Sequence, residues 1–344
     1  MTSDDTMKAV FLTEPEEFEL REVPVPEVGP RDVLVAVKAC GVCGSDIHFM
    51  ENGRIGDFIV REPLVLGHEA AGEVVRVGQQ VKTLSVGDHV AMEPGIPCGH
   101  CDYCHRGRYN LCQDVVFLSA PPYDGFFQEY VAVPEDFAYR LPDGMSMEAG
   151  ATVEPLSVGL HGTNMAELDP GDHVVVLGAG PIGLLTTAAA RARGATDITT
   201  VDLLEHRLEF ALRMGASRVL NAAETDVRAE LEDTADVVLD CATVDETLDE
   251  AFDIVRPGGR IAWVGMAAEV ARVPFQKFQV KELKVTGVFR YANCFRTAVE
   301  LIASGQIDTE PLITDRFDFP DVEQAVKFAA ANRQTALKTM VNFT

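Results

Sequence analysis

The sequence predicts an α/β protein in which a β-rich domain encloses an inserted, doubly wound domain with a parallel sheet. Residues 7–40 and 67–92 read as short strands interrupted by Gly and Pro, a pattern typical of irregular β-rich domains. In the middle of the chain, buried strands alternate with helices, which indicates a parallel sheet. After Gly287 this alternation ends, and a helix at 295–305 and a last strand at 337–343 return to the first domain.

The inserted domain can be followed element by element. An apolar strand over residues 172–177 ends in a glycine turn, and the helix that follows stops at Gly194. Such continuous apolar strands belong in parallel sheets that helices cover on both faces. The alternation continues through a strand, a helix and three more strands, at residues 198–203, 207–215, 217–221, 236–242 and 259–265.

We therefore expect three segments along the chain. The first domain covers residues 1–156 and includes a cysteine-rich lobe at 94–113. The nucleotide-binding domain covers residues 157–289, and residues 290–344 return to the first domain.

The charge of the chain excludes some partners. The 54 acidic and 29 basic residues give a formal net charge of −25, which disfavours nucleic acid and anionic lipid as partners. No apolar run is long enough to span a membrane, and the acidic start MTSDDTMKAV is unlike a signal peptide, so we expect a cytoplasmic protein. The acidic excess fits either a salt-rich cytosol or an ordinary acidic protein, and the sequence leaves both open.

A glycine-rich turn marks the expected nucleotide site. The pattern is G-x-G-x-x-G; it follows an apolar strand and opens a helix, which is the context that dinucleotide binding requires. The first glycine permits a tight turn, the second lets the backbone approach the pyrophosphate, and the third lets the helix pack against the strand. The residues expected to bind cofactor here are Gly178, Gly180, Pro181, Ile182 and Gly183.

Asp202 ends the second strand of this domain, 19 residues after Gly183. A carboxylate in this place accepts hydrogen bonds from the ribose hydroxyls of NAD and repels the 2′-phosphate of NADP. We therefore predict NAD as the cofactor. Arg207 is a candidate neighbour of the adenosine, although a solvated helix residue is an equally good interpretation.

Four cysteines in one loop predict a structural zinc site. Cys98, Cys101, Cys104 and Cys112 are separated by two, two and seven residues. Four thiolates at short spacing form a closed tetrahedral zinc site, which leaves no position for a substrate. Iron–sulfur clusters use different spacings, and a zinc ribbon for nucleic acid does not fit the negative charge.

A second set of potential ligands is spread along the first domain. Cys43 follows one strand, and His68 and Glu69 precede another. A thiolate, an imidazole and a carboxylate in a chain with a nucleotide domain predict a zinc ion with one open position, as catalytic zinc has. Glu154 lies just before the inserted domain, and direct binding and binding through a water molecule both remain open for it.

Several segments carry a family resemblance. GHEAAGEVVRVGQQV is similar to the zinc signature of medium-chain alcohol dehydrogenases. Within that superfamily the chain resembles the polyol dehydrogenases of sorbitol and xylitol. The segments that carry the likeness sample the chain between residues 37 and 294, and they are CGVCGSDIHFMENGRIGDFIV, PLVLGHEAAG, EPLSVGLH, GAGPIG and KVTGVFRYANC.

The resemblance implies a GroES-like catalytic domain joined to a Rossmann domain, with NAD and two zinc ions per chain, one catalytic and one structural. It implies oxidation of a secondary hydroxyl of a small polyol to the ketose, and assembly as a homotetramer. Cys43, His68 and Glu69 would hold the catalytic zinc, with Glu154 beside its water.

The resemblance also implies roles for residues around the substrate. Ser45 would form a hydrogen bond with the reacting oxygen, and Phe117, Arg290 and Tyr291 would contact the substrate. Three positions depart from residues common in the family, which leaves the length and stereochemistry of the polyol open: Phe49, Met50 and Ala120.

The expected reaction needs an outlet for one proton. Zinc would lower the pKa of the substrate hydroxyl, and a hydride would pass to the nicotinamide. Ser45 and His48 form one candidate outlet, and Glu154 with a water molecule forms another. Asp46 would orient a zinc ligand. The rivals are a threonine, butanediol or glucose dehydrogenase of the same fold and a non-catalytic cofactor-binding protein.

Overall fold

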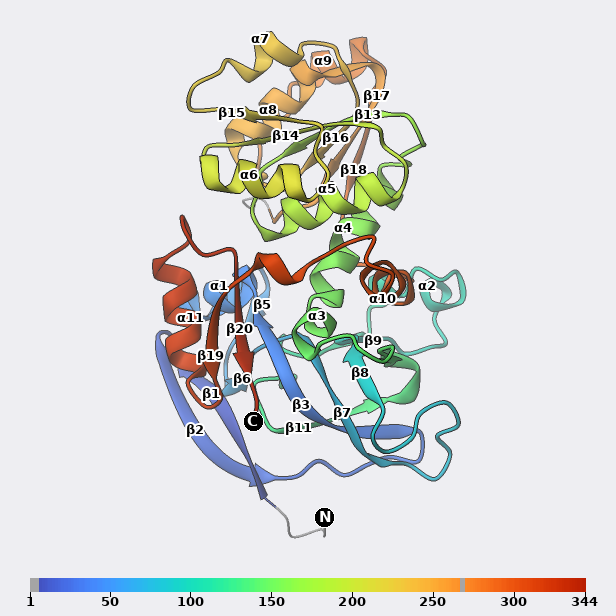
Figure 1. The fold of residues 1–344 in the computed structure, drawn as a ribbon, viewed down its shortest axis with the longest axis vertical. Coiled ribbons are helices and arrows are strands. Elements are labelled where there is room, and N and C mark those ends of the chain that lie inside the picture. Colours follow the sequence, from blue (N-terminus) through green and yellow to red (C-terminus); the bar gives the residue numbers. More distant parts are fainter. Residues whose placement is uncertain (1–5, 267–269) are drawn as a thin grey trace. The chain divides into compact units, whose positions relative to one another are not determined.

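The computed structural model describes residues 6–266 and 270–344 of the 344-residue chain (Figure 1). Residues 1–5, part of the segment taken as unlike a signal peptide, lie outside the described residues. The contacts divide the chain into two compact units. Unit 1 comprises Met1–Glu154, Phe295–Ala303 and Thr309–Thr344, and unit 2 comprises Pro155–Cys294 and Ser304–Asp308. The domain limits expected from the sequence stay a prediction.

A seven-stranded sheet forms the centre of unit 1. The strand order is β12-β8-β7-β3-β20-β19, with β11 also paired to β3. Neighbouring strands are antiparallel except for the parallel pair β19 and β20. The strands are β3 (Asp32–Val42), β7 (Glu69–Val77), β8 (His89–Met92), β11 (Tyr130–Pro134), β12 (Ala138–Arg140), β19 (Ile313–Asp318) and β20 (Lys338–Asn342).

Smaller sheets and short helices complete unit 1. One sheet has the order β2-β1-β6, and two ribbons pair β4 with β5 and β9 with β10. These strands are β1 (Thr6–Glu14), β2 (Glu17–Pro24), β4 (Arg54–Ile55), β5 (Phe58–Ile59), β6 (Leu64–Val65), β9 (Gly95–Ile96) and β10 (Val116–Phe117). The helices are α1 (Gly44–Asn52), α2 (Asp102–His105), α3 (Met147–Ala151), α10 (Phe295–Ala303) and α11 (Val322–Ala331), with 3-10 turns η1 (Tyr109–Leu111), η2 (Glu135–Phe137) and η3 (Glu310–Leu312).

The core of unit 1 forms around β3 because almost every residue of DVLVAVKACGV is apolar. Most of this strand is buried, and Val35 and Cys40 belong to the same hydrophobic cluster as Phe126 and Phe127. Fully burying a side chain such as Val or Phe contributes about 1.5–3 kcal/mol. The well-packed centre gives a rigid platform for residues at the ends of β3 and its neighbours.

Unit 2 is built on a six-stranded parallel sheet with the order β15-β14-β13-β16-β17-β18. Counted along the unit, this is the order 3-2-1-4-5-6 of a Rossmann fold, so the predicted fold class is confirmed. The strands are β13 (His173–Leu177), β14 (Asp197–Asp202), β15 (Arg218–Asn221), β16 (Ala235–Asp240), β17 (Val255–Trp263) and β18 (Lys284–Gly287). The helices are α4 (Val153–Met165), α5 (Pro181–Ala192), α6 (Glu205–Arg213), α7 (Val227–Leu231), α8 (Asp245–Ile254) and α9 (Phe275–Val280).

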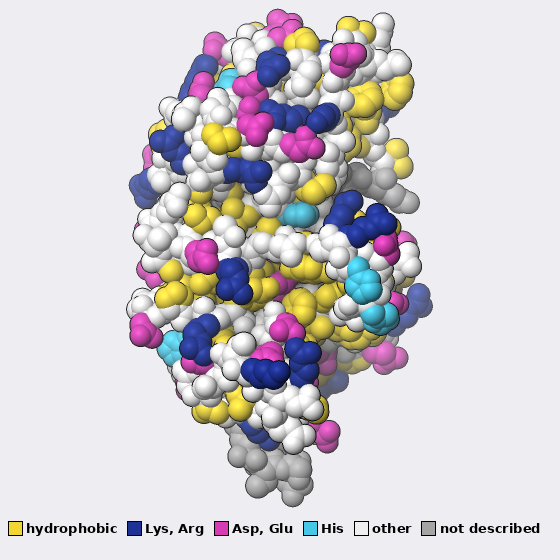
Figure 2. All heavy atoms as spheres, turned by 90° about the vertical axis from the view of Figure 1, so that its right-hand side faces the viewer, with side chains coloured by type: hydrophobic (Ala, Val, Ile, Leu, Met, Phe, Trp, Pro, Cys, Tyr) yellow, Lys and Arg dark blue, Asp and Glu magenta, His cyan; other side chains and the backbone are white. Residues whose placement is uncertain are grey.

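The surface agrees with the polar composition. Over residues 6–266 and 270–344, no helix combines the length and the apolar character that crossing a membrane requires. Acidic and basic side chains are interspersed on the face drawn in Figure 2. The acidic excess is therefore not gathered into one patch on that face.

Candidate metal centres and cofactor site

The four cysteines of the lobe converge. Their sulfur atoms lie within 4.8 Å of one another, with 3.4 Å between Cys101 and Cys104 and 3.9 Å between Cys98 and Cys104. A tetrahedral zinc ion with Zn–S bonds of about 2.3 Å requires sulfur–sulfur separations of about 3.8 Å. All four cysteines are free of disulfides. The spacing and chemistry of these donors fit zinc.

Backbone N–H groups favour the thiolate of Cys98, the form of cysteine that binds a metal, whereas burial raises the pKa of Cys104 and of Cys112. A hydrogen bond from the His100 backbone is the main cause that lowers the pKa of Cys98 to about 6. The Cys98 backbone N–H points at the Cys112 sulfur, 3.4 Å away. The His100 ring is exposed and lies 2.8 Å from the Cys98 carbonyl oxygen, so it is not a fifth ligand.

The second group of potential metal ligands, Cys43, His68 and Glu69, is brought together by strand pairing. Cys43 lies between the end of β3 and the start of α1, while His68 directly precedes β7. β3 and β7 are antiparallel with Gly41 opposite Glu69, which brings Cys43 beside the pair that starts β7. The ligand atoms of Cys43, His68 and Glu69 lie within 4.8 Å of one another.

Lys338 is a member of this site that sequence reasoning missed. Its ammonium lies 2.7 and 2.8 Å from the two Glu69 carboxylate oxygens and 3.1 Å from the Val42 carbonyl oxygen. Gly41 leaves room for this carboxylate, since a Cβ there would collide with it. Burial opposes the charge of Lys338, but Glu69, Cys43 and Glu154 together outweigh burial, and the pKa of Lys338 is raised. One signal was available: a lysine inside the apolar final strand LKTMVNF.

Asp46 lies beside Cys43 and His68. Its carboxylate accepts hydrogen bonds from the backbone N–H groups of Cys43 at 2.9 Å and Gly67 at 3.1 Å. The His68 Nδ1 atom is 3.7 Å from an Asp46 oxygen. Complete burial raises the pKa of Asp46, against the effect of His68 and the two N–H donors. Asp46 thereby fixes the backbone on both sides of the ligand group.

The electrostatic field of the second group attracts a cation. Burial lowers the pKa of His68, but Cys43, Asp46 and Glu154 outweigh it and the pKa is raised well above its ordinary value. Groups that stabilise an imidazolium in this way also stabilise a divalent cation. With a sulfur, a nitrogen and a carboxylate donor, the residues fit zinc with an open position.

Other predicted residues of unit 1 lie near this group. Glu154 is buried in the first turn of α4 and interacts with His68 and Lys338, but it is outside the set of ligand atoms within 4.8 Å. The Phe117 ring is 5.9 Å from the His68 ring at an angle of 52°. Ser45 and His48 lie on α1, where Ser45 is half-buried and His48 is exposed.

The glycine-rich turn of unit 2 has the expected geometry. Gly178 has φ +92°, in the left-handed region that favours glycine. Gly180 caps α5, which begins with Pro181 and Ile182. A Cβ on Gly183 would collide with the Gly178 carbonyl oxygen, so this position requires glycine. The free N–H groups at the start of α5 are suited to phosphate.

Asp202 ends β14 beside this turn. Its carboxylate accepts hydrogen bonds from the backbone N–H groups of Ala179 at 2.7 Å and Leu204 at 3.0 Å. Arg207 lies 3.7 Å from the same carboxylate. The side chain is thus held by the glycine turn on one side and by the start of α6 on the other.

Arg290 and Tyr291 follow β18 in unit 2. Arg290 has φ +54°, and its guanidinium lies 4.7 Å above the centre of the Phe289 ring. The Tyr291 side chain is buried. Their predicted contact with the substrate stays a prediction.

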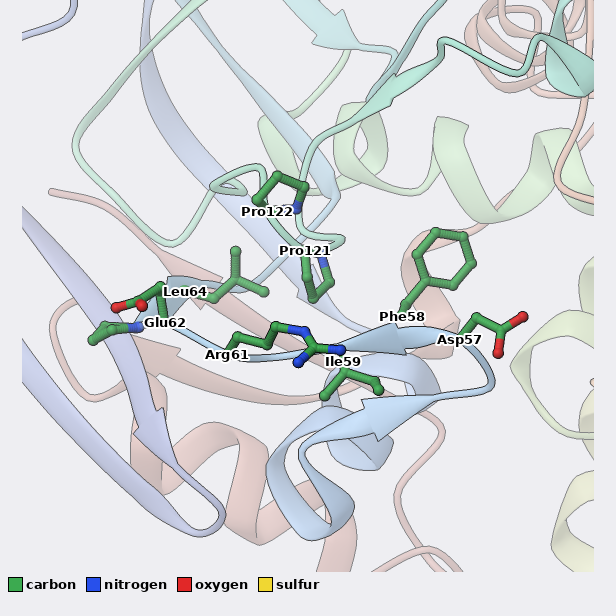
Figure 3. Close-up of a pocket in the computed structure, with 9 residues that line it drawn as sticks. Asp57, Phe58, Ile59, Arg61, Glu62, Leu64, Pro121 and Pro122 are labelled. Carbon is green, nitrogen blue, oxygen red and sulfur yellow. The ribbon is translucent and has the colours of Figure 1, made fainter.

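A separate pocket of about 290 Å³ lies in unit 1 (Figure 3). Residues of the β4–β5 ribbon and the segment that leads to β6 face Pro121 and Pro122 across it. None of the predicted metal or substrate residues lines this pocket. It therefore does not belong to the metal group described above.

A Rossmann unit and a mixed-donor metal group in one chain define the class of zinc-binding dehydrogenases. Two family models agree: residues 29–143 match the alcohol dehydrogenase GroES-like domain, and residues 181–304 match the zinc-binding dehydrogenase family. The chain belongs to the zinc-binding medium-chain alcohol dehydrogenase superfamily, as its sequence motifs predicted.

Known proteins similar to the chain cover almost its full length. A sorbitol dehydrogenase of Bacillus subtilis is 40% identical over 99% of this chain and 98% of its own. A probable D-xylulose reductase A of Aspergillus clavatus is 43% identical over 92% and 91%. These relatives support polyols as the class of substrate.

Solved structures agree with the fold. An Escherichia coli oxidoreductase/dehydrogenase of unknown specificity, 37% identical, has a TM-score of 0.95 and covers 99% of this chain and 100% of its own. A Sinorhizobium meliloti zinc-binding dehydrogenase bound to NADP has 32% identity, a TM-score of 0.91 and coverages of 98% and 100%. An Escherichia coli alcohol dehydrogenase complexed with NADH has 30% identity, a TM-score of 0.91 and coverages of 98% and 99%. Nicotinamide cofactors of both kinds therefore occur among similar proteins.

Proposed function

We propose that this protein oxidises a secondary hydroxyl of a small polyol, such as sorbitol or xylitol, to the ketose, with NAD as the hydride acceptor. The observation that carries the proposal is the convergence of Cys43, His68 and Glu69 in a chain with full-length likeness to sorbitol dehydrogenases. Cys43, His68 and Glu69 would hold a catalytic zinc, and the four lobe cysteines a structural one.

The surrounding residues prepare the metal group for this reaction. Bound zinc supplies a Lewis acid that makes the substrate hydroxyl more acidic. Lys338 orients the Glu69 carboxylate and compensates its buried charge. Asp46 holds the backbone at Cys43 and Gly67, so the ligands need little rearrangement when they bind an ion.

A proton must leave the substrate, and α1 offers a route. Ser45 and His48 are three residues apart and therefore lie on the same side of the helix. Ser45 is half-buried while the His48 ring is exposed, so the pair would carry the proton toward solvent. The buried Glu154 carboxylate is the competing acceptor, since it interacts with His68 and Lys338.

The preference for NAD rests on Asp202. Its carboxylate is anchored by two backbone N–H groups beside the glycine turn, and a carboxylate in this place would repel a 2′-phosphate. Arg207 pairs with Asp202 and would flank the adenosine rather than hold a phosphate. Gly178, Gly180, Pro181, Ile182 and Gly183 would bind the pyrophosphate.

Three residues would select the substrate. Phe117 lies beside the His68 ring and would form an apolar wall for the carbon chain. Arg290 and Tyr291 would form hydrogen bonds with the hydroxyls that do not react. A guanidinium and a phenol are suited to a polyol because together they offer several donors and an acceptor.

We propose that the protein is a homotetramer. Unit 2 exposes several large apolar side chains within one stretch, including Val270 and Val280, which are 82% and 77% exposed. β18 ends the strand order and presents an unpaired edge among the described strands. Exposed apolar groups and a free strand edge both favour self-association, which light scattering would test.

The function can be tested by turnover measurements on the whole protein. Rates of NADH formation are compared for sorbitol, xylitol, ribitol, arabitol, butanediol, glucose and threonine, with NAD and with NADP, before and after chelation. We expect a polyol with NAD to give the highest kcat/KM, and chelation to abolish the activity. A higher kcat/KM for threonine, butanediol or glucose, or with NADP, would contradict the proposal.

A matched pair of variants isolates the role of Asp202. Asp202→Asn should reduce the preference for NAD over NADP by about tenfold, because the repulsion of the 2′-phosphate is lost. Asp197→Asn alters the opposite, exposed end of the same strand and should leave the preference unchanged.

A further inference from the structure

Glu93 is a fully buried carboxylate that the proposed reaction does not use. It directly follows β8, and its backbone N–H donates to the Phe137 carbonyl oxygen at 2.8 Å. The Tyr109 hydroxyl donates to one carboxylate oxygen at 2.7 Å, and the Tyr139 hydroxyl donates to the other at 2.9 Å. A carboxylate is costly to bury unless it is hydrogen-bonded, so these two donors are part of the reason why it is tolerated.

The two tyrosines come from different parts of unit 1. Tyr109 begins η1, between the third and fourth cysteines of the lobe, and its ring meets Phe137 edge-on at 6.1 Å. Tyr139 lies on β12, opposite Ala91 of β8 in the main sheet. The Glu93 carboxylate therefore joins the lobe to the sheet.

The lobe depends on such a connection because it has little core of its own. Its helix α2 contains no buried residue, and η1 contains only Asn110. A bound zinc ion would hold the four sulfur atoms together but would not fasten the lobe to the sheet. Hydrogen bonds to a charged acceptor are stronger than those between neutral groups, so the two bonds to Glu93 can provide this connection.

The segment that follows Glu93, Pro94–Ile96, connects it to the second metal group. The Pro94 carbonyl oxygen accepts a hydrogen bond from the Leu118 N–H at 2.9 Å, and β9 pairs with β10 so that Gly95 is opposite Phe117. A Cβ on Gly95 would lie 3.5 Å from the Phe117 ring, so the ring rests on this glycine. Phe117 also lies beside His68, with 5.9 Å between ring centres.

We propose that Glu93 is a positioning residue that fastens the cysteine lobe to the main sheet and, through β9 and β10, holds Phe117 against His68. Glu93 touches neither substrate nor metal ligand and acts through the segment Pro94–Ile96 and through Tyr109. The part of this proposal that concerns the substrate wall rests on the proposed function. The part that concerns the lobe does not.

The test compares Glu93→Gln with the unaltered protein in three measurements. The first is the rate at which a chromogenic chelator removes zinc from the lobe at pH 8, where the Glu93 carboxyl is ionised; this rate should rise about tenfold when the charged acceptor is lost. The second is the visible spectrum of cobalt(II) placed at Cys43, His68 and Glu69 while the lobe keeps zinc, which should shift. The third is the KM for the polyol, which should rise more than kcat falls, with unchanged affinity for the nicotinamide nucleotide.

Glu148→Gln is the matched control. This carboxylate lies on α3 of the same unit and is bound by Arg316 and Asn342, both at 2.8 Å. The Glu148→Gln substitution should lower the melting temperature without changing zinc release or the cobalt spectrum. Equal zinc release from both variants would overturn the proposal, because general destabilisation would then explain the effect.

A second variant and a separate test of the function make the result decisive. If Glu93→Gln does not fold, Tyr109→Phe removes one of the two hydrogen bonds and should also speed zinc release. Zinc release and a cobalt spectrum that match the unaltered protein would overturn the positioning role. A protein that oxidises no polyol would contradict the proposed function, yet zinc release and the cobalt spectrum would still decide the role of Glu93.

Discussion

The two metal groups of unit 1 are built in opposite ways. The lobe takes its four thiols from one continuous loop, and three of them are half-buried. The second group takes a thiol, an imidazole and a carboxylate from the ends of two paired strands, with His68 and Glu69 buried. A closed site thus needs only a local stretch of chain, whereas an open, buried site needs strands that hold its ligands together.

The electrostatic surroundings of the two metal groups also differ, since local groups act on the lobe and charged residues from separate elements act on the second group. Backbone N–H groups and neighbouring sulfurs set the pKa of Cys98 in the lobe. Around the second group, Asp46, Glu154 and Lys338 all act on the ligands through their charges. Because burial amplifies charge interactions, removing one charged neighbour should affect the second group much more than the lobe.

The largest expected effect comes from removing one thiol from each group. Cys43→Ser should lower kcat at least about a thousandfold and remove one zinc per chain, because a ligand of the proposed catalytic ion is lost. Cys101→Ser should remove the other zinc and lower the melting temperature by about 5 °C or more, with a smaller loss of activity. Zinc analysis, kinetics and thermal unfolding measure these effects. An active Cys43→Ser variant would refute the assignment of the catalytic group.

A smaller effect should follow from removing the charge of Lys338. Lys338→Met leaves Glu69 buried without its partner, which should reduce the free energy of unfolding of the metal-free protein by about 3–5 kcal/mol. The loss should be smaller with zinc bound, since the ion then compensates Glu69. Urea unfolding with and without zinc measures both values.

Lys281→Met serves as the control for this prediction. Lys281 forms an ion pair with Asp233 at 2.6 Å in unit 2. Its removal should cost the same stability with and without zinc. A Lys338 variant with equal losses in both states would show that the residue does not act through the metal group.

The smallest effect concerns pH and the buried carboxylate beside the lobe. Burial raises the pKa of Glu93 to about 7, although the hydroxyls of Tyr109 and Tyr139 act in the opposite direction. Arg296 and Asp136 are the other charged groups near this cluster, and both act on Tyr139. Between pH 4.5 and about 7 the unfolded chain has lost this proton while the folded chain keeps it. Rising pH therefore favours unfolding over this interval.

The corresponding measurement is urea unfolding of the unaltered protein and Glu93→Gln from pH 5 to pH 8 with excess zinc. The free energy of unfolding of the unaltered protein, minus that of the variant, should fall by up to about 3 kcal/mol as the pH rises. If this difference in unfolding free energy stays constant or increases from pH 5 to pH 8, Glu93 is ionised throughout that range.

Much of the candidate site could be predicted from the sequence because its motifs are local. The lobe cysteines lie in a single loop, and the glycine turn connects one strand to the next helix, so the spacing of a few residues determines both. Cys43 and His68 are 25 residues apart, so their donor types in a chain with a nucleotide domain, and then the family likeness, joined them rather than their spacing. Their convergence follows from the register between β3 and β7.

By itself the sequence determined the fold class, the closed four-cysteine lobe, the glycine turn and the family, since each depends on residue type at short range. Only the tertiary structure decided which charges surround the second metal group. Lys338 comes to Glu69 because β20 pairs with β3, and Tyr109 and Tyr139 reach Glu93 from two separate segments. Residues distant in the chain become partners only when burial of a common core fixes their strands side by side, and no local pattern records which partners those will be.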